Sequence, residues 1–341
     1  MIKEKILIIG PSWLGDMVMA QALFKTLLQL NPNVIIDVVA PTWSLSVLQR
    51  MPEITNKIEL AIPHGKLCLL KRYKLAKSLQ QNNYTSAIVL TNSWKSALIP
   101  WLAKIKKRTG WVGELRFGLI NDIRYLNKKK YISMISRYIA LAYPANYKLS
   151  NPLLNPIMKP KLTTDPNNLM LLKTKFNINN NLPKLPILAL CIDAAFGLAK
   201  CWPEEYYIEL AEHKIKQNWQ VWIFGTKPNL SINNSSNLIL NFSGKTSLID
   251  TIDLLSLVDV VVCNDSGLMH IAASFNKKII AIYGPTSSEF TPPIADCVKI
   301  VNKNLQCSPC FARTCPLEHH KCMKEITVEL INNEVDKIYS L

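Results

Sequence analysis

The stretch Lys5-Ile6-Leu7-Ile8-Ile9-Gly10-Pro11-Ser12-Trp13-Leu14-Gly15-Asp16 decides the fold class, because it has the layout of a buried strand, a glycine loop and the start of a helix. A helix is expected from about Gly15 through Leu30, where apolar residues recur at helical spacing. Those residues are Met19, Leu23, Leu27 and Leu30. A strand followed by a glycine loop and a helix is the opening unit of a parallel α/β sheet.

The same layout begins again about half a chain later. Ile187–Cys191 is a short apolar run, a loop follows to Trp202, and Pro203 opens a helix whose Glu204 and Glu205 complement the positive end of its dipole. Further Val/Ile-rich runs alternate with helical stretches, which indicates parallel sheets covered by helices. These runs are Ile35–Val39 and Ala87–Leu90 in the first half, and Gln220–Phe224, Asp259–Cys263 and Lys278–Tyr283 in the second.

A proline-rich region from about Pro144 to Pro186 interrupts this alternation, and its later part is interpreted as a domain boundary. We therefore expect an α/β protein with two Rossmann-like, doubly wound domains, residues 1–170 and 171–341. In open α/β sheets, ligands bind beyond the carboxyl ends of the strands. The loops that follow the strands are consequently where the chemistry is expected.

Composition narrows the class of protein. The chain has 341 residues, 49% of them hydrophobic, and 40 Lys+Arg against 24 Asp+Glu give a formal charge of +16. Such a chain can bury two cores, which excludes disorder as its main state. The run Leu185–Ala199 is broken by a proline and a charge and falls short of the roughly 20 residues that span a bilayer. No signal peptide is expected either, because the first apolar run ends at Gly10-Pro11.

The loop from Gly10 to Asp16 excludes two common nucleotide sites. A phosphate-binding P-loop needs Lys and then Ser or Thr after its second glycine, but Asp16 and Met17 stand there. The dinucleotide fingerprint G-x-G-x-x-G is also absent, which disfavours a dehydrogenase. Asp16 is either a general base at a helix start or a first-turn residue that the helix dipole stabilises.

The second loop, Asp193–Glu205, carries Lys200 just before a helix start. An ammonium there can neutralise a phosphate that backbone N–H groups also hold. The alternative is a solvated surface lysine. Trp202 is expected to pack and to fix the loop.

The third loop, Cys263–His270, follows an apolar strand and leads into a helix. Ser266 and the amide of Gly267 are candidate donors to a diphosphate at the helix N-terminus. Asp265 or Ser266 could instead serve only as an N-cap, and His270 could be a core histidine. Three such loops at equivalent strand ends favour a binding function over these alternatives.

A specific combination of motifs extends over nearly the whole chain. It consists of Pro11–Gln21, Lys200 with Trp202-Pro203, Asn264–His270, Tyr283–Ser287 and Phe290–Pro293, extended by Arg108–Trp111, Gly118–Asp122 and Arg137–Ala142. Together these motifs resemble glycosyltransferase family 9, the heptosyltransferases. The resemblance implies a glycosyltransferase-B architecture, in which two Rossmann-like domains face each other across a cleft. It also implies an inverting transfer that requires no cofactor or catalytic metal.

The resemblance further implies the substrates and the catalytic roles. The donor would be ADP-L-glycero-D-manno-heptose, and the acceptor would be the first heptose of the lipopolysaccharide inner core on lipid A. Asp16 would take the proton from the acceptor hydroxyl, and Lys200 would stabilise the departing diphosphate. Donor contacts are expected from Asp265, Ser266, Gly267, His270, Gly197, Gly225, Lys245 and Thr246. Acceptor contacts are expected from Ser12, Trp13, Gly15, Arg108, Arg116 and Asn121.

One departure from the family pattern concerns the donor side. Members commonly have a Pro-Gly-Ala-Glu-like start to the second loop, whereas this chain has Ile192-Asp193-Ala194-Ala195. The extra acid at Asp193 and the missing one at Ala195 leave the donor contacts of this loop open. A family 9 transferase with another donor or acceptor, or a degenerate nucleotide-binding relative without catalysis, are the alternatives.

The positive charge predicts an anionic partner. A phosphorylated lipopolysaccharide core and the anionic cytoplasmic face of the inner membrane both fit, so a cytoplasmic enzyme in peripheral contact with that membrane is expected. Candidates for this contact are Arg108, Arg116, Arg124 and the run Lys128–Lys130. The alternative is that they form a solvated charged face. Nucleic acid is not expected as a partner, because the net charge is the only feature that would support it.

Nine cysteines without an export signal argue for reduced thiols, metal ligands or core residues. Cys307, Cys310, Cys315 and Cys322 have the density of a structural zinc site, with two histidines between the last pair. However, the six residues between the members of that last pair are not a usual zinc-knuckle spacing. Reduced thiols that pack a C-terminal loop are the expectation, with zinc as the alternative.

Overall fold

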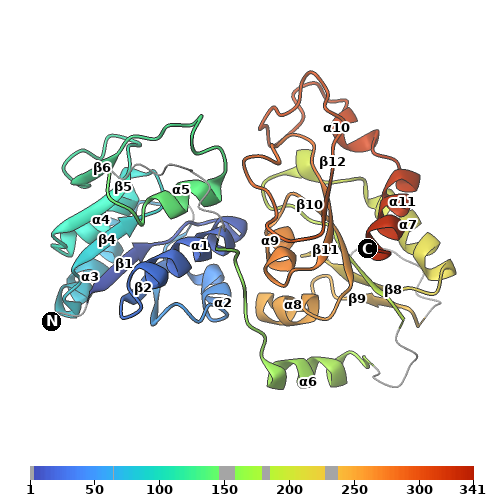
Figure 1. The fold of residues 1–341 in the computed structure, drawn as a ribbon, viewed down its shortest axis with the longest axis horizontal. Helices are drawn as coiled ribbons and strands as arrows, with labels where there is room; N and C mark the ends of the chain where they lie inside the picture. Colours follow the sequence, from blue (N-terminus) through green and yellow to red (C-terminus); the bar gives the residue numbers. More distant parts are fainter. Residues whose placement is uncertain (1–3, 64, 146–157, 179–184, 227–236) are drawn as a thin grey trace. The chain divides into compact units, whose positions relative to one another are not determined.

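The computed structural model describes residues 4–63, 65–145, 158–178, 185–226 and 237–341, which form two compact units divided between Thr163 and Thr164 (Figure 1). A boundary after residue 170 would cut helix α6 (Pro166–Lys175). This helix packs against α8 (Leu248–Leu255) of the second unit, and Nδ2 of Asn168 donates to Asp253 at 2.8 Å. The division therefore lies before α6.

The first unit is a six-stranded parallel sheet with strand order β3-β2-β1-β4-β5-β6. Its strands are β1 (Lys5–Ile9), β2 (Ile35–Pro41), β3 (Asn56–Leu60), β4 (Ser86–Val89), β5 (Lys107–Trp111) and β6 (Asp122–Arg124). Its helices are α1 (Leu14–Leu30), α2 (Leu45–Leu48), α3 (Leu69–Leu79), α4 (Trp94–Leu102) and α5 (Met134–Ala140). The strand order is that of nucleotide-binding Rossmann folds.

The second unit repeats this winding with strand order β12-β11-β10-β7-β8-β9, again all parallel. Its strands are β7 (Ile187–Cys191), β8 (Gln220–Phe224), β9 (Ile239–Asn241), β10 (Val260–Asn264), β11 (Lys278–Ile282) and β12 (Val298–Val301). After α6, its helices are α7 (Glu204–Lys216), α8, α9 (Gly267–Ser274), α10 (Lys321–Lys324) and α11 (Val328–Tyr339). The expected pair of doubly wound α/β units is confirmed.

Each core lies between the central strands and the helices that cover them. In the second unit, Trp202 is 2% exposed, packs edge-on against Tyr207, and donates from Nε1 to the carbonyl of Ile326 at 2.8 Å. The packing role expected for Trp202 is therefore confirmed. Within the described ranges, no helix is both long and apolar enough to cross a bilayer.

The outer strands are the elements that the sequence analysis did not find. β3 has the sequence Asn-Lys-Ile-Glu-Leu and leaves three of its five residues exposed, because it lies at a sheet edge. β5, β6, β9 and β12 likewise lie beside an edge or at one. Hydrophobic runs mark only strands buried on both faces, so strands that are part-exposed escape this signal.

Candidate active-site residues

The winding of each unit determines where a ligand can bind. Because all strands in a sheet are parallel, their carboxyl ends meet at one edge, and the chain reverses its direction of winding between β1 and β4 and between β7 and β10. Ligands of open α/β sheets bind at this reversal. The loop 10–16 follows β1, and the loops that contain Lys200 and Asp265 follow β7 and β10. The three loops singled out in the sequence thus lie at the two switch points.

Lys200 and Asp265 form an ion pair at the second switch point. The ammonium of Lys200 lies 2.5 Å from Oδ2 of Asp265 and 3.3 Å from its backbone carbonyl. The two side chains are 12% and 6% exposed, so Lys200 is not the solvated surface lysine of the alternative. An ammonium has three N–H donors, and these two contacts use two of them. One donor is left for an incoming anion.

Asp265 is held on its other side by the loop after β11. Its Oδ2 accepts a hydrogen bond from Oγ1 of Thr286 at 2.7 Å, and its Oδ1 accepts one from Oγ1 of Thr291 at 3.3 Å. The sequence analysis assigned no role to these two threonines. Three donors on one carboxylate make Asp265 a positioning residue that fixes the ammonium of Lys200.

Ser266 occupies the N-cap position of α9 without acting as a side-chain cap. Its Oγ makes no capping hydrogen bond, and it is among the described buried polar atoms that have no partner. A buried hydroxyl without a partner is uncommon and calls for a ligand or an ordered water. The amide of Gly267 begins the same helix, where the dipole favours an anion. The end of α9 therefore offers donors beside the ammonium of Lys200.

His270 lies in the same helix, one turn further on, and is 5% exposed. Burial is the main cause that lowers its pKa to about 4, and the ammonium of Lys200 adds to the effect while Asp265 opposes it. The imidazole is therefore neutral at pH 7. It can donate one N–H to a ligand, but it brings no charge to the site.

Asn264 joins the two loops of the switch point and is fully buried. Its Nδ2 donates to the carbonyl of Ile192 at 2.9 Å, and its Oδ1 accepts from the backbone N–H of Trp202 at 3.0 Å. The sequence analysis included Asn264 in a motif but gave it no role. Its signal was a polar side chain at the end of an otherwise apolar strand.

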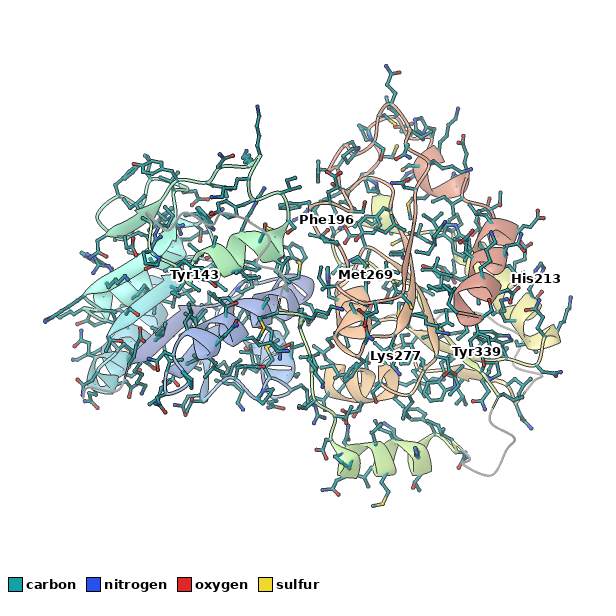
Figure 2. All side chains as sticks on the ribbon, viewed as in Figure 1. Tyr143, Phe196, His213, Met269, Lys277 and Tyr339 are labelled. Atoms are coloured by element: carbon teal, nitrogen blue, oxygen red, sulfur yellow. The ribbon has the colours of Figure 1, made fainter. Side chains whose placement is uncertain are left out.

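The loop around Gly197 is supported by the segment that contains Arg313. A Cβ atom at Gly197 would overlap the backbone of Arg313, and the amide of Ala199 donates to the Arg313 carbonyl at 3.1 Å. The ring of Phe196 (Figure 2) lies 4.8 Å from the ammonium of Lys200 and 5.5 Å from the guanidinium of Arg313. Two cations thus contact one aromatic ring beside the Lys200–Asp265 pair.

The extra acid of the second loop, Asp193, ties the loop after β7 to the loop after β8. Its Oδ2 accepts from the backbone N–H and, at 2.7 Å, from Oγ1 of Thr226. The carbonyl of Gly225 in turn accepts from the amide of Gly244 at 3.0 Å. Asp193 therefore links the loop after β7 to the loop after β8 by hydrogen bonds.

The predicted donor residues Gly225, Lys245 and Thr246 follow β8 and β9, at the same edge of the sheet. Lys245 is exposed, and Oγ1 of Thr246 lies 3.1 Å from Oγ1 of Thr251. The strand order places these residues at the same edge of the sheet as Lys200 and Asp265. Among the described residues, no hydrogen bond or ion pair joins these three residues to the Lys200–Asp265 pair.

In the first unit, Ser12, Trp13, Gly15 and Asp16 share the loop after β1 and the first turn of α1. The carbonyl of Ser12 accepts from Nε1 of Trp43 at 3.0 Å, which anchors the loop. Asp16 is half-buried, and its charge adds to burial in raising the pKa of Tyr138, which lies in the adjoining helix α5. A carboxylate in the first turn is consistent both with dipole stabilisation and with a base at the sheet edge.

Three predicted acceptor residues prove to be bound by the protein's own backbone. Arg108 donates to the carbonyls of Ile105 and Leu119, both at 2.6 Å, and Asn121 bridges the amide of Arg108 and the carbonyl of Lys106. Arg116 is 3% exposed and donates to the carbonyls of Thr91 and Trp111. These contacts hold the loop 112–121 on the sheet, because buried carbonyls need donors.

Arg124 is likewise structural. Its guanidinium pairs with Asp122 at 2.8 Å and donates to the carbonyl of Tyr143 at 2.9 Å. Lys128 and Lys129 are exposed. Of the predicted basic contacts, the arginines thus stabilise the first unit, whereas these lysines keep a free charged surface.

The cysteine cluster borders the donor loops. Cys307, Cys310, Cys315 and Cys322 are free thiols that line one pocket together with His319, His320, Ala199 and Pro285. Burial, followed by the nearby thiols, raises the pKa of Cys322. In the described part of the chain, no three Cys, His, Asp or Glu side chains are placed to hold a metal ion. The segment packs through the amide of Phe311, which donates to the Pro285 carbonyl at 2.7 Å.

Known proteins match this chain along most of its length. It is 40% identical over 307 residues to lipopolysaccharide heptosyltransferase 2 of Escherichia coli, and 44% identical over 306 residues to lipooligosaccharide heptosyltransferase 2 of Haemophilus influenzae. These alignments cover 87% of this chain in both cases, and 87% and 88% of the relatives. The structure of E. coli ADP-heptose lipopolysaccharide heptosyltransferase II superposes with a TM-score of 0.86 at 36% identity over 98% of each chain.

The likeness to that structure confirms the glycosyltransferase-B class of fold. Residues 72–321, which include Lys200, Asp265 and three of the four clustered cysteines, match the family description "Glycosyltransferase family 9 (heptosyltransferase)". The resemblance of the sequence motifs, the paired Rossmann-like units and these matches agree. The chain belongs to glycosyltransferase family 9 and is a glycosyltransferase of the heptosyltransferase group.

Proposed function

We propose that this enzyme transfers L-glycero-D-manno-heptose, with inversion, from ADP-heptose to the first heptose of the lipopolysaccharide inner core. The observation that carries the proposal is the Lys200–Asp265 pair beside the unpartnered hydroxyl of Ser266 at the start of α9. A cation, a hydroxyl and a helix N-terminus at one switch point suit a diphosphate. The relatives at 40–44% identity, whose names specify heptosyl transfer to lipopolysaccharide or lipooligosaccharide, support the choice of sugar.

The donor diphosphate is bound by the second unit. The remaining N–H of Lys200, the amide of Gly267 and the hydroxyl of Ser266 donate to phosphate oxygens, and neutral His270 adds one N–H. Negative charge grows on the leaving ADP as the bond between its phosphate oxygen and the anomeric carbon breaks. Lys200, held in place by Asp265, and the donors at the start of α9 stabilise that charge with little reorganisation, and in this proposal the transfer needs neither a metal nor a cofactor.

The acceptor is activated by the first unit. Asp16 takes the proton from the acceptor hydroxyl while that oxygen forms a bond to the anomeric carbon on the face opposite the diphosphate. The bond to ADP breaks in the same displacement, which inverts the anomeric configuration. Ser12, Trp13 and Gly15 share the loop of Asp16 and are the proposed acceptor contacts. Arg108, Arg116 and Asn121 are left out, because their side chains hold their own backbone.

The place of action follows from the acceptor. A heptosylated core on lipid A is anchored in a membrane, and ADP-heptose is a cytoplasmic nucleotide sugar, so the enzyme works at the cytoplasmic face of the inner membrane. Its excess of 16 positive charges suits the phosphates of the core and the anionic leaflet. Nucleic acid is not a partner in this proposal.

ADP release tests the proposal. We expect purified protein to release ADP from ADP-heptose only when a mono-heptosylated core acceptor is present, and Asp16→Asn to slow release about 1,000-fold, since general-base catalysis contributes about 10²–10⁴. Thermal unfolding of the variant should match the wild type. Release that Asp16→Asn does not change would remove Asp16 from the role of base. Folded, ADP-binding protein without any release would favour a degenerate binder, and release only with ADP-mannose would favour another donor.

A further inference from the structure

The first unit exposes large apolar side chains where its helices begin. Leu70 is 77% exposed, Leu115 is 89% exposed and Phe117 is 61% exposed. Single exposed apolar residues are normal on a soluble protein, but a contiguous group of them marks an interaction site. Leu69, Tyr73 and Trp94 are also exposed. Leu69, Leu70 and Tyr73 lie in the first turns of α3, Trp94 begins α4, and the other two belong to the loop after β5.

Hydrogen bonds show that these three segments form one surface. Nη1 of Arg72 in α3 donates to the carbonyl of Lys95 in α4 at 3.2 Å, and Nζ of Lys95 donates to the carbonyl of Gly65 before α3 at 2.9 Å. On the other side, the amide of Trp94 donates to the carboxylate of Glu114 at 3.2 Å. The ends of α3 and α4 and the residues from Glu114 to Phe117 are therefore continuous.

The same surface is basic. Lys66, Lys71 and Lys74 are exposed around the leucines of α3, and Lys95 stands at the start of α4. Glu114, the acid in the contacts just described, is engaged by the amide of Trp94. Exposed leucines and aromatic rings surrounded by lysines are the composition of segments that lie in the interface of an anionic membrane. A protein partner would need acidic groups around an apolar centre, whereas the anionic leaflet supplies both over any area.

The topology places this surface on the catalytic side of the sheet. α3, α4 and the loop after β5 begin at the carboxyl ends of parallel strands, and so does the loop that carries Asp16. β4 is the direct neighbour of β1, so the start of α4 follows the strand next to the Asp16 loop. Contact at this edge would bring Asp16 to the plane in which a lipid-anchored acceptor lies.

We propose that the surface formed by Leu69, Leu70, Tyr73, Trp94, Leu115 and Phe117, with its surrounding lysines, binds the anionic phospholipid surface of the membrane that holds the acceptor. The proposal rests on the proposed function, because that function supplies the membrane-anchored acceptor. It assigns the membrane contact to the ends of α3 and α4 and to residues 114–117, in place of the arginines 108, 116 and 124, which the protein's own chain engages. The apolar side chains insert at headgroup depth, and the lysines contact lipid phosphates.

Vesicle binding by the full chain tests this surface. The variants are L70S/L115S for the apolar part and K66Q/K74Q for the charged part. A matched control, L171S/K216Q, changes an exposed leucine of α6 and an exposed lysine of α7 in the second unit. The probes are vesicles of phosphatidylethanolamine with phosphatidylglycerol, and vesicles of phosphatidylcholine alone. Co-sedimentation gives the affinities, and thermal unfolding checks that all variants are folded.

We expect wild type and control to bind the anionic vesicles equally. K66Q/K74Q should bind them about 20-fold more weakly, since each lysine near an anionic surface contributes about fivefold. L70S/L115S should bind about tenfold more weakly, through lost apolar insertion. Equal binding by both variants and the control would overturn the proposal, and so would wild-type protein that sediments with neither kind of vesicle.

A water-soluble acceptor separates this proposal from the proposed function. With a lipid-free mono-heptosylated core oligosaccharide, L70S/L115S should release ADP at the wild-type rate, because no membrane is involved. A large loss with that acceptor would make the surface part of the acceptor site and would overturn the membrane assignment. Wild-type protein that binds anionic vesicles through this surface but releases no ADP would refute the proposed function alone.

Discussion

The two units share one strand order but differ at the edge where their ligands are expected to bind. In the second unit that edge is buried and cross-linked: Lys200, Asp265 and Asn264 are engaged by partners from several loops. In the first unit, Asp16 is half-buried and the surrounding helix ends expose leucines and aromatic rings. The same winding therefore supports a pre-organised site in one unit and an open, membrane-compatible edge in the other. A small diphosphate suits the former, and a large lipid-anchored acceptor suits the latter.

Among the further tests of this comparison, the largest expected effect concerns the cross-linked edge of the second unit. Lys200→Gln should lower the rate of ADP release about 300-fold, because the loss of one pre-organised donor to a leaving group has an effect of about 10²–10³. It should also destabilise the fold by about 3 kcal/mol, because Asp265 keeps a buried charge without its cation. Urea unfolding and ADP release measure the two effects.

The double variant K200Q/D265N separates stability from catalysis. Removing both charges should restore most of the unfolding free energy, because no isolated charge stays buried. It should not restore ADP release, since the cation is still missing. Recovery of turnover in the double variant would show that Lys200 acts only by stabilising the fold. Lys200 would then have no direct role in catalysis.

The second effect is a pH dependence of the unfolding free energy, which arises from burial of His270. The pKa of His270 is lowered to about 4 in the folded protein, below the 6.5 of a free imidazole, so the unfolded chain binds the proton more readily. The contribution of His270 to stability is therefore complete above pH 6.5 and is lost as the pH falls toward 4. Between pH 7.5 and 4.5, protonation of His270 should lower the unfolding free energy by about 2–3 kcal/mol.

His270→Gln measures that contribution. The fall in unfolding free energy between pH 7.5 and 4.5 should be smaller in this variant than in the wild type by about 2–3 kcal/mol. Leu171→Ser, which changes an exposed side chain of α6 that does not titrate, is the control and should follow the wild type. Equal pH dependence in His270→Gln and the wild type would mean that the imidazole is not held neutral by burial.

The central strands and the loops that follow them could be predicted from sequence, because they depend on local pattern, but the contrast between the two edges could not. Central strands such as Ile187–Cys191 are continuous apolar runs, and the loops after them were found from glycines and capping residues. The part that was missed depends on pairing between distant segments. Thr286 and Thr291 reach Asp265 only because β11 pairs with β10 in a given register.

The arginines of the first unit make contacts that their sequence positions did not indicate. Arg108 and Arg116 were expected to contact an anionic acceptor, because the family resemblance implies acceptor contacts there and the chain carries an excess of positive charge. In the structure the Arg108 guanidinium donates to the carbonyl of Leu119, and the Arg116 guanidinium donates to the carbonyl of Thr91. A sequence shows where a cation stands, but not which carbonyls the fold leaves without a donor.

The smallest expected effect is at Ser266, and it sharpens the comparison most directly. Because Oγ of Ser266 has no partner in the protein, Ser266→Ala should leave the unfolding free energy unchanged or slightly raised. If the hydroxyl donates to the diphosphate, ADP should bind about 30-fold more weakly, since a hydrogen bond to a charged group contributes about 2 kcal/mol. Ser247→Ala, which removes a hydroxyl that caps α8, should do the reverse, lowering stability by about 1 kcal/mol with unchanged ADP affinity. Calorimetric titration with ADP and urea unfolding distinguish the two serines. Unchanged ADP affinity in Ser266→Ala would mean that the Ser266 hydroxyl binds water and not the diphosphate.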